Sequence, residues 1–394
     1  PYNEIVALRV NSNFASKHET MDKAGMANLC LRLLAAGTEH STEEEISDRL
    51  ERNGSHYKAE AGKDISLVEL LTTRESLQTD IEMLLETIDS PTFLEKKLAR
   101  EKEIVRMSIL EQEDSRLTLT MRNFRQHYYG EHPYAWSNMG LVSTLDQITR
   151  DDLVAFAEKA FDPSQLLVTV VGGTEAGETL DRVQTAFTHR PSRNGVLDAA
   201  SSPANVAVQA DLDVVEHRES EAEYIVMGYP GCGMTAKDAI PLRIIGAILG
   251  GSMDSRLFRE IRDKRGLCYQ VGATFSPQHE HTPLLMYMVT SPANRQEAVK
   301  CAEAEIERLK EELVDEDELR RVKTYINGNY VMAMETNRGQ VSRYSTYEMA
   351  GLGWDYTNQF PEQIDAVTAE QLRDVARRCF THRLVTITSP PPSE

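Results

Sequence analysis

The feature that most constrains the fold is an internal repeat. Three segments of the first half recur in the same order in the second half: LERNGSHY (50–57) as RDKRGLCY (262–269), LVELLT (67–72) as LMYMVT (285–290), and ITRDDLVAFAEKAF (148–161) as VTAEQLRDVARRCF (367–380). Ordered self-similarity of this kind indicates that one structural unit is present twice. We therefore expect two copies of one α+β unit, each of about 200 residues.

The chain length agrees with this division. At 394 residues the protein is too long for one ordinary hydrophobic core. Residues 190–206 (RPSRNGVLDAASSPANV) have no periodicity and are rich in Pro, Ser, Ala and Asn, which is typical of a linker. The sequence predicts an N-terminal domain at 1–189, a linker at 190–206 and a C-terminal domain at 207–394.

Local patterns predict the elements of each copy. Residues 20–52 have the apolar spacing of helices, with Ser41 or Thr42 as the cap of the second one. Residues 145–173 predict a capped helix, a break at an Asp-Pro pair and a buried strand that ends in glycines. Residues 295–345 are predicted as one long charged helix.

Composition excludes several classes of partner. The chain has 43 Lys and Arg against 62 Asp and Glu, a formal net charge of −19, which argues against binding to nucleic acid or anionic lipid. The balance suits basic or neutral peptides, although a solubilising surface is the favoured explanation. No run of 18 apolar residues is present, so no membrane span is expected. The five cysteines are dispersed without a CxxC motif and indicate neither a disulfide framework nor a zinc ribbon.

Residues 248–275 (ILGGSMDSRLFREIRDKRGLCYQVGATF) contain the most distinctive candidate site. A short amphipathic helix is predicted to end at Gly266, and an alternating strand follows. This arrangement places Arg262 and Tyr269 seven residues apart around one corner, where a guanidinium and a phenol can hold a carbonyl or a carboxylate. On spacing alone, the favoured interpretation is a solvated Arg262 and a half-buried, structural Tyr269.

Other reactive side chains favour structural interpretations. His279–His281 (HEH) is the only local histidine cluster, and its polar surroundings predict a solvated turn. His127 and His132 have no acid paired with them in the sequence. Cys30 is predicted to be a buried thiol and not a nucleophile, because no histidine and acid accompany it. His56 and Tyr57, in the first copy of the corner, are assigned structural roles.

Four segments together resemble the insulinase/pitrilysin family of zinc peptidases, in particular its bacterial two-domain members and the mitochondrial processing peptidase subunits. They are KAGMANLCLRLLAAGT (23–38), YYGEHPYAWSNMGLVSTLDQITRDDLVAF (128–156), FDPSQLLVTVVGG (161–173) and GGSMDSRLFREIRDKRGLCYQVGA (250–273). The resemblance implies two homologous α/β-sandwich domains, each a mostly antiparallel sheet packed by helices, in a clamshell-like arrangement. It also implies that Arg262 and Tyr269 correspond to the family's Arg/Tyr pair, which helps to bind substrate and to stabilise the intermediate.

The zinc motif is where the chain departs from this family. Active members have H-x-x-E-H on the first helix, with two metal-binding histidines and a glutamate that activates water. Alignment of the first helix places Asn28, Leu31 and Arg32 at these positions. The third ligand position falls near Ser108, with Glu101 the nearest family-like acid. The sequence therefore predicts a degenerate site and no metal ligand in this chain.

The resemblance and the vacant motif together predict a non-catalytic subunit of a heterodimeric zinc metallopeptidase. Its Arg262 and Tyr269 would act in trans at a zinc-bearing paralogous partner on an extended peptide substrate, with zinc in the partner alone. A scaffold or peptide-binding protein of the same fold, without a peptidase role, is the alternative. A misaligned active enzyme is disfavoured because no other such motif occurs. Export of bacterial relatives favours the periplasm over the cytoplasm, and the start is compatible with a removed signal.

Overall fold

The computed structural model describes residues 4–173, 176–188 and 208–392. The predicted linker at 190–206 lies outside these residues. The chain forms two compact units, and each includes a segment from the other half of the sequence. Unit 1 comprises residues 1–110, 136–202 and 333–355, and unit 2 comprises residues 111–135, 203–332 and 356–394.

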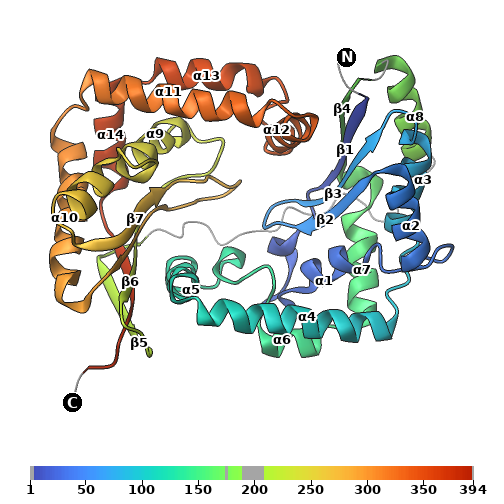
Figure 1. Cartoon of the computed structure of the whole chain (residues 1–394), viewed down its shortest axis with the longest axis horizontal. Helices are drawn as coiled ribbons and strands as arrows, with labels where there is room; N and C mark the ends of the chain where they lie inside the picture. Colours follow the sequence, from blue (N-terminus) through green and yellow to red (C-terminus); the bar gives the residue numbers. More distant parts are fainter. Residues whose placement is uncertain (1–3, 174–175, 189–207, 393–394) are drawn as a thin grey trace. The chain divides into compact units, whose positions relative to one another are not determined.

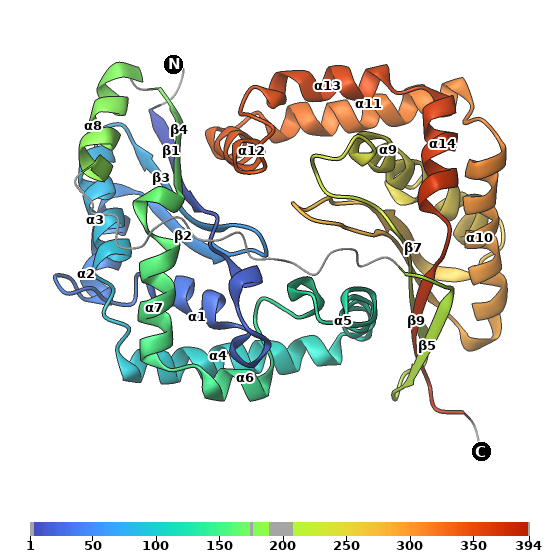
Figure 2. The same ribbon diagram turned by 180° about the vertical axis from the view of Figure 1, so that it is seen from behind.

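Unit 1 is built on a four-stranded antiparallel sheet in the order β2-β3-β1-β4. Helices cover one face of this sheet, as Figures 1 and 2 show, and form the hydrophobic core with it. The strands are β1 (Ile5–Ser12), β2 (His56–Ala61), β3 (Ser66–Thr73) and β4 (Leu166–Gly172), and the core helices are α1 (Met26–Leu33), α3 (Leu77–Asp89), α7 (Arg150–Ala160) and α8 (Ala176–Thr188). Helix α12 (Asn337–Met349), from the second half, packs on β1 and β4.

Unit 2 contains a five-stranded sheet in the order β5-β9-β6-β8-β7. Its elements are β5 (Leu212–His217), β6 (Glu223–Tyr229), β7 (Cys268–Thr274), β8 (Leu284–Thr290) and β9 (Leu384–Ser389), with α9 (Ala239–Gly250), α10 (Arg295–Glu311) and α14 (Ala369–Cys379). Strand β5 is parallel to β9, and the other pairs are antiparallel. Without β5, the order β9-β6-β8-β7 repeats β4-β1-β3-β2 of unit 1. The predicted α+β class and internal duplication are confirmed.

The duplication extends to the capping of equivalent helices. Thr149 caps α7 and accepts a hydrogen bond from the backbone N–H of Asp152 at 3.3 Å. Thr368 caps α14 in the same way, with Gln371 at 3.3 Å. In both, the third residue returns a side-chain bond to the cap, which forms a capping box. This pairing explains why the two segments align so closely in sequence.

The exchanged helices are held by different chemistry. Helix α12 is held by buried charges on the sheet of unit 1: Glu69 accepts from both Arg9 and Arg338, and Arg9 also donates to Ser342 at 3.0 Å. Helix α5 (Arg116–Tyr129), from the first half, packs on β6 and β9 of unit 2 through hydroxyl contacts. The Thr120 hydroxyl lies 2.7 Å from that of Thr388. Sequence periodicity does not indicate either exchange, because each covering helix comes from the other repeat.

The single long helix predicted at 295–345 is wrong, because the segment forms α10, α11 (Glu316–Ala333) and α12. The breaks follow from side chains that satisfy free backbone N–H groups at helix starts. The carboxylate of Asp315 accepts from the N–H of Glu318 at 3.2 Å, and the Thr336 hydroxyl accepts from Gly339 at 3.0 Å. The remaining α-helices are α2 (Glu43–Asn53), α4 (Glu95–Asp114), α6 (Val142–Gln147) and α13 (Tyr356–Ala366).

Across the described residues, no helix combines the length and the apolar character that a membrane crossing requires.

Candidate functional site

The candidate corner in unit 2 begins with an irregular helical turn. Residues Phe258–Asp263 (η5) form a π-helix instead of the ordinary helix expected there. Leu257 and Ile261 are fully buried and anchor it. Gly266 follows at φ +62°, and the N–H of Leu267 donates back to the Ile261 carbonyl at 2.9 Å. A π-helical turn is rare and frequently lies at a functional site. We refer to residues 258–274 as the Gly266 corner.

Tyr269 occupies an irregular position in the strand that follows. In the pairing of β7 with β8, Cys268 lies opposite Thr290 and Gln270 lies opposite Val289, so Tyr269 is the additional residue of a β-bulge. Such a bulge redirects a side chain, because the alternation of faces is interrupted. Tyr269 is 68% exposed. The half-buried Tyr269 favoured by spacing alone is therefore wrong.

Arg262 differs from the other arginines of this segment. Arg256, Arg259 and Arg265 each pair with a carboxylate. No carboxylate of a described residue lies within 4.0 Å of the Arg262 guanidinium, which rests over the Phe258 ring at 4.7 Å from its centroid. A stacked, exposed guanidinium keeps its hydrogen-bond donors available to a ligand. The corner thus presents an unpaired cation and an exposed phenol.

Buried contacts hold this corner in place. Arg256, at 5% exposure, makes a bidentate ion pair with Glu318 (2.9 and 2.6 Å) and lies 3.6 Å from Glu305. Helix α9 approaches β7 closely at Gly250, where a Cβ atom would lie 1.8 Å from the backbone nitrogen of Ala273. Gly250 is therefore required for helix-to-strand packing.

The first copy of the corner lies in unit 1, and its tyrosine is placed differently. We refer to residues 43–61 as the Gly54 corner. Gly54 has the same φ of +62°, and the N–H of Ser55 donates to the Leu50 carbonyl at 2.8 Å. Tyr57 is half-buried against the core of unit 1, and its hydroxyl lies 3.1 Å from that of Thr87. Burial raises the pKa of Tyr57 above its usual value. Tyr57 has the structural role expected of it.

The positions aligned with the family's metal motif do not fit a divalent cation. Leu31 is buried at 1% exposure in the core of unit 1, and the amide nitrogen of Asn28 is buried without a hydrogen bond. Arg32 forms an ion pair with Glu101 of α4. A fixed guanidinium at this place repels a metal ion. Among the described residues, no group of three His, Cys, Asp or Glu side chains is arranged to hold one.

The structure brings Glu101, and not Ser108, against α1. Ser108 lies two helical turns further along α4, about 10 Å away along the axis. Its hydroxyl donates to the carbonyl of Ile104 at 3.1 Å. Glu101 is therefore the acid of α4 that contacts α1, and Arg32 neutralises it.

Glu19 was not indicated by any sequence pattern. Its carboxylate is buried at 5% exposure beside the start of α1, where it accepts from the N–H groups of Gly25 at 3.2 Å and Ala27 at 2.5 Å. Burial raises its pKa to about 7, although these two hydrogen bonds act in the opposite direction. The tertiary structure brings Glu19 to the start of α1, the helix that contains Asn28.

The histidine cluster is not the solvated turn that the sequence predicted. His132 is buried at 4% exposure and lies 2.8 Å from the Glu280 carboxylate, so it has the acid partner that the sequence did not indicate. The Tyr128 hydroxyl lies 3.0 Å from Nδ1 of His281, and burial lowers the pKa of His281. These contacts pack the end of α5 and the segment after it against the rest of unit 2, which is a structural role.

The five cysteines are all free thiols. Cys30 is fully buried, as expected, and burial raises the pKa of its thiol. Cys268 is also buried, whereas Cys232, Cys301 and Cys379 are half-buried.

Comparison with protein families gives two matches that together span most of the chain. A family model described as insulinase (peptidase family M16) matches residues 1–140. A second model, described as the peptidase M16 inactive domain, matches residues 147–326.

Curated relatives and solved structures resemble the chain along nearly its full length. A zinc protease of Rickettsia felis, itself uncharacterized, is 23% identical, over 85% of this chain and 80% of its own. The zinc protease PqqE of Helicobacter pylori is 23% identical, over 90% of this chain and 82% of its own. The crystal structure of a peptidase M16 inactive domain from Pseudomonas fluorescens has a TM-score of 0.91 at 20% identity, covering 100% of this chain and 95% of that one. A protease from Helicobacter pylori has a TM-score of 0.87 at 20% identity, covering 98% and 95%.

Proposed function

Because the chain belongs to the insulinase family (peptidase family M16), we propose that it is the non-catalytic subunit of a two-chain zinc peptidase. In this proposal a paralogous partner holds the metal, and this chain contributes Arg262 and Tyr269 to the partner's substrate site. The observation that carries the proposal is the Gly266 corner, in which an exposed Tyr269 and a carboxylate-free Arg262 are presented together.

The first helix supports the non-catalytic part of the proposal. Leu31 has no proton to exchange and is buried, so it cannot replace the family's glutamate as a general base. Arg32 is held by Glu101, so a fixed positive charge stands at a position that the resemblance assigns to a metal-binding histidine. Relatives that carry the name zinc protease support a role connected with proteolysis, and their names assign no metal to this chain.

Arg262 and Tyr269 have the chemistry that peptide hydrolysis requires next to a metal. Arg262 can donate two hydrogen bonds to the carbonyl of the cleaved bond, and Tyr269 can donate one. Negative charge develops on that oxygen in the transition state, so donors placed there lower the barrier. The substrate would be an extended peptide that pairs with a sheet edge of the partner.

A scaffold or peptide-binding role without peptidase activity is the competing function. If this role is correct, substitution of Arg262 or Tyr269 should not change proteolysis. No described contact requires Tyr269 for stability, because its side chain is mostly exposed.

The test is co-purification of this chain with an H-x-x-E-H paralogue from the same genome, followed by metal analysis and peptide-cleavage assays. We expect this chain alone to bind no stoichiometric zinc and to cleave nothing, and the mixture to be active. Arg262→Ala should lower kcat/KM of the mixture about 10²- to 10³-fold, which is typical for loss of an oxyanion donor, and Tyr269→Phe should also lower it.

Arg265→Ala is the matched control. It removes a nearby guanidinium that is already paired with Glu260, so activity should be retained. One zinc per isolated chain, or proteolysis by the isolated chain, would overturn the proposal. Full activity of the Arg262→Ala mixture would instead favour the scaffold role.

A further inference from the structure

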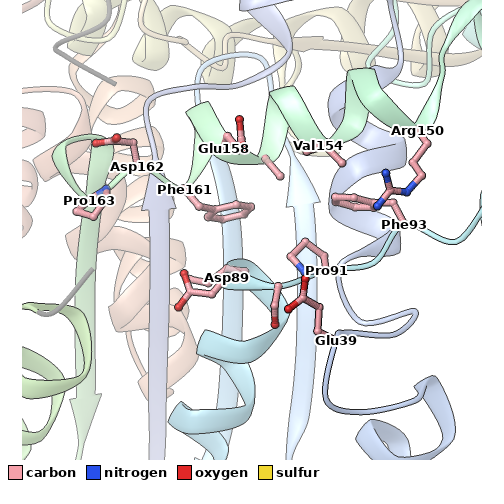
Figure 3. A pocket seen from close by; sticks show the side chains of 13 residues that line it. Glu39, Asp89, Pro91, Phe93, Arg150, Val154, Glu158, Phe161, Asp162 and Pro163 are labelled. Carbon is pink, nitrogen blue, oxygen red and sulfur yellow. The ribbon is translucent and has the colours of Figure 1, made fainter. Parts of the chain in front are cut away.

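A cavity of about 410 Å³ in unit 1, shown in Figure 3, has few free groups for a ligand. Of the acids that line it, Asp89, Glu158 and Asp162 already have interaction partners. The rings of Phe93 and Phe161 are buried, so a ligand would find almost no aromatic surface there. One face of α11 in unit 2 has the opposite property, because its apolar side chains are exposed.

This face of α11 carries three residues in a line. Tyr325, Gly328 and Met332 are three and four residues apart, so they lie on the same side of the helix. Tyr325 is 47% exposed and Met332 is 63% exposed. Two helical turns, about 10 Å, separate these two residues along the axis. We refer to Tyr325, Gly328 and Met332 as the α11 stripe.

Gly328 leaves an open position in the middle of the stripe. A Cβ atom added there would meet no atom of the described residues within 4 Å. A glycine inside an exposed helix lowers the stability of the helix relative to alanine, and no described contact requires one here. Positions that break a local rule in this way without a packing reason are often functional. The stripe therefore has an open notch at Gly328, with Tyr325 on one side and Met332 on the other.

The surroundings of the notch are uncharged. Residues 324–334 (TYINGNYVMAM) contain no charged side chain, although 27% of the residues of the chain are charged. Lys323, just before them, donates to the carbonyl groups of Asp365 and Val367. Exposed methionines are common on surfaces that bind apolar side chains of varied shape. The chemistry of the stripe therefore favours an uncharged, apolar ligand.

Contacts connect the stripe with the segment that leads into the Gly266 corner. The Tyr325 hydroxyl donates to the Gly251 carbonyl at 3.0 Å. Asp254 lies 3.3 Å from Arg321 of α11 and 3.5 Å from Arg259 of the corner. One carboxylate thus bridges the helix of the stripe and the helical turn that carries Arg262.

Met253 extends the apolar surface from the stripe towards the corner. It is 78% exposed, and it directly precedes the bridging carboxylate. An extended peptide advances about 3.3 Å per residue. A peptide held at the Gly266 corner therefore has side chains within reach of the stripe a few residues from the bond to be cleaved.

We propose that the α11 stripe binds one uncharged, apolar side chain of the peptide substrate. This rests on the proposed function, which brings the peptide to the Gly266 corner. The side chain enters the notch at Gly328 and contacts Tyr325 and Met332, and burial of apolar surface on both partners supplies the binding free energy. The stripe selects the peptide, whereas Arg262 and Tyr269 act on the cleaved bond.

The first test is photo-cross-linking of the mixture of this chain and its zinc-bearing paralogue. The probe is a short peptide of neutral residues with one photo-leucine, and a chelator removes zinc so that the probe stays intact. Mass spectrometry should locate the label within residues 325–332 or at Met253. A competing peptide with leucine at the same position should suppress labelling, and its serine counterpart should not. A label elsewhere, or equal suppression by both competitors, would overturn the proposal.

The second test fills the notch. Gly328→Gln should reduce labelling and raise KM for the leucine peptide about tenfold, as expected for loss of one apolar side-chain contact, with kcat unchanged. Because the position is open, the fold should be retained, which circular dichroism checks. Gly177→Gln, at an equally open position of α8, is the matched control and should change neither quantity. Unchanged labelling and KM in Gly328→Gln would contradict the proposal.

Two further outcomes separate this proposal from its alternatives. Cleavage by the zinc-loaded mixture without labelling of α11 would overturn the present proposal alone, whereas labelling without cleavage would overturn only the proposed function. Sedimentation of this chain by itself tests a second copy as the occupant of the stripe. A dimer that is lost in Gly328→Gln would show that the stripe is covered by another copy, and the proposal would then be wrong.

Discussion

The Gly54 and Gly266 corners begin from almost the same sequence signal and end with opposite side-chain placements. Each leads from a helical turn into the edge strand of its sheet, with a glycine at φ +62° and a tyrosine three residues later. Tyr57 packs inward and contacts Thr87, whereas Tyr269 is 68% exposed. The same local motif therefore serves the core in unit 1 and presents a polar ring in unit 2.

Two irregularities explain the difference. The Gly266 corner has a π-turn before the glycine and a β-bulge after it, whereas the pairing of β2 with β3 is regular. One additional residue in a helical turn rotates the side chains that follow it about the helix axis. One additional residue in a strand moves the following side chains to the opposite face of the sheet. Such insertions cost stability, and their presence at one corner only agrees with the role proposed for Tyr269.

The largest expected effect comes from the buried ion pair of Arg256, which holds the Gly266 corner and has no counterpart among the described residues of the Gly54 corner. Arg256→Met removes the cation of a buried pair and leaves Glu318 and Glu305 without it, so the free energy of unfolding should fall by about 3 kcal/mol. Hydrogen exchange measured by mass spectrometry should accelerate in residues 258–274 and not in residues 43–61. Arg259→Met, which removes a more exposed arginine, is the control. Unchanged exchange at the Gly266 corner would mean that Arg256 does not support it.

The second largest effect is the difference in stability between variants of Tyr57 and Tyr269. Tyr57→Ala should lower the free energy of unfolding by about 2 kcal/mol, because it removes a half-buried ring from the core. Tyr269→Ala should change it by less than about 0.5 kcal/mol, since an exposed side chain away from the core contributes little. Urea denaturation followed by circular dichroism measures both. Equal losses would remove the contrast between the corners.

The smallest expected effect is one that the corners share. Gly54→Ala and Gly266→Ala should each cost about 1 kcal/mol, because both glycines have a positive φ and no atom lies near an added Cβ. Gly328→Ala, inside α11 and equally open, should instead stabilise the chain by about 1 kcal/mol. Thermal denaturation of the three variants gives the comparison. A markedly larger cost at Gly266 alone would show that the π-turn adds strain there.

Much of the fold was predictable because it depends on local patterns that occur twice. The repeat predicted two α+β units, and the capping residues Thr149 and Thr368 fixed the starts of equivalent helices. The exchange of α5 and α12 was not predictable from the sequence. Arg9 and Glu69 form a polar patch on the sheet of unit 1, and this patch makes sense only once α12 from the other half of the chain packs on it.

The candidate site was predictable in its residue types and not in their arrangement. The sequence named Arg262 and Tyr269, and it showed Asn28, Leu31 and Arg32 in place of a metal motif. The exposure of Tyr269, the pairing of Arg32 with Glu101 and the burial of His132 against Glu280 required the fold.

The sequence alone determined the duplication and the family, because both are written in residue identity and spacing, and it predicted a degenerate metal motif. The tertiary structure alone decided which tyrosine faces outward and which acid faces the first helix. The physical reason is that burial, pairing and register depend on contacts between segments far apart in the chain, and these contacts leave no periodic signal in either segment.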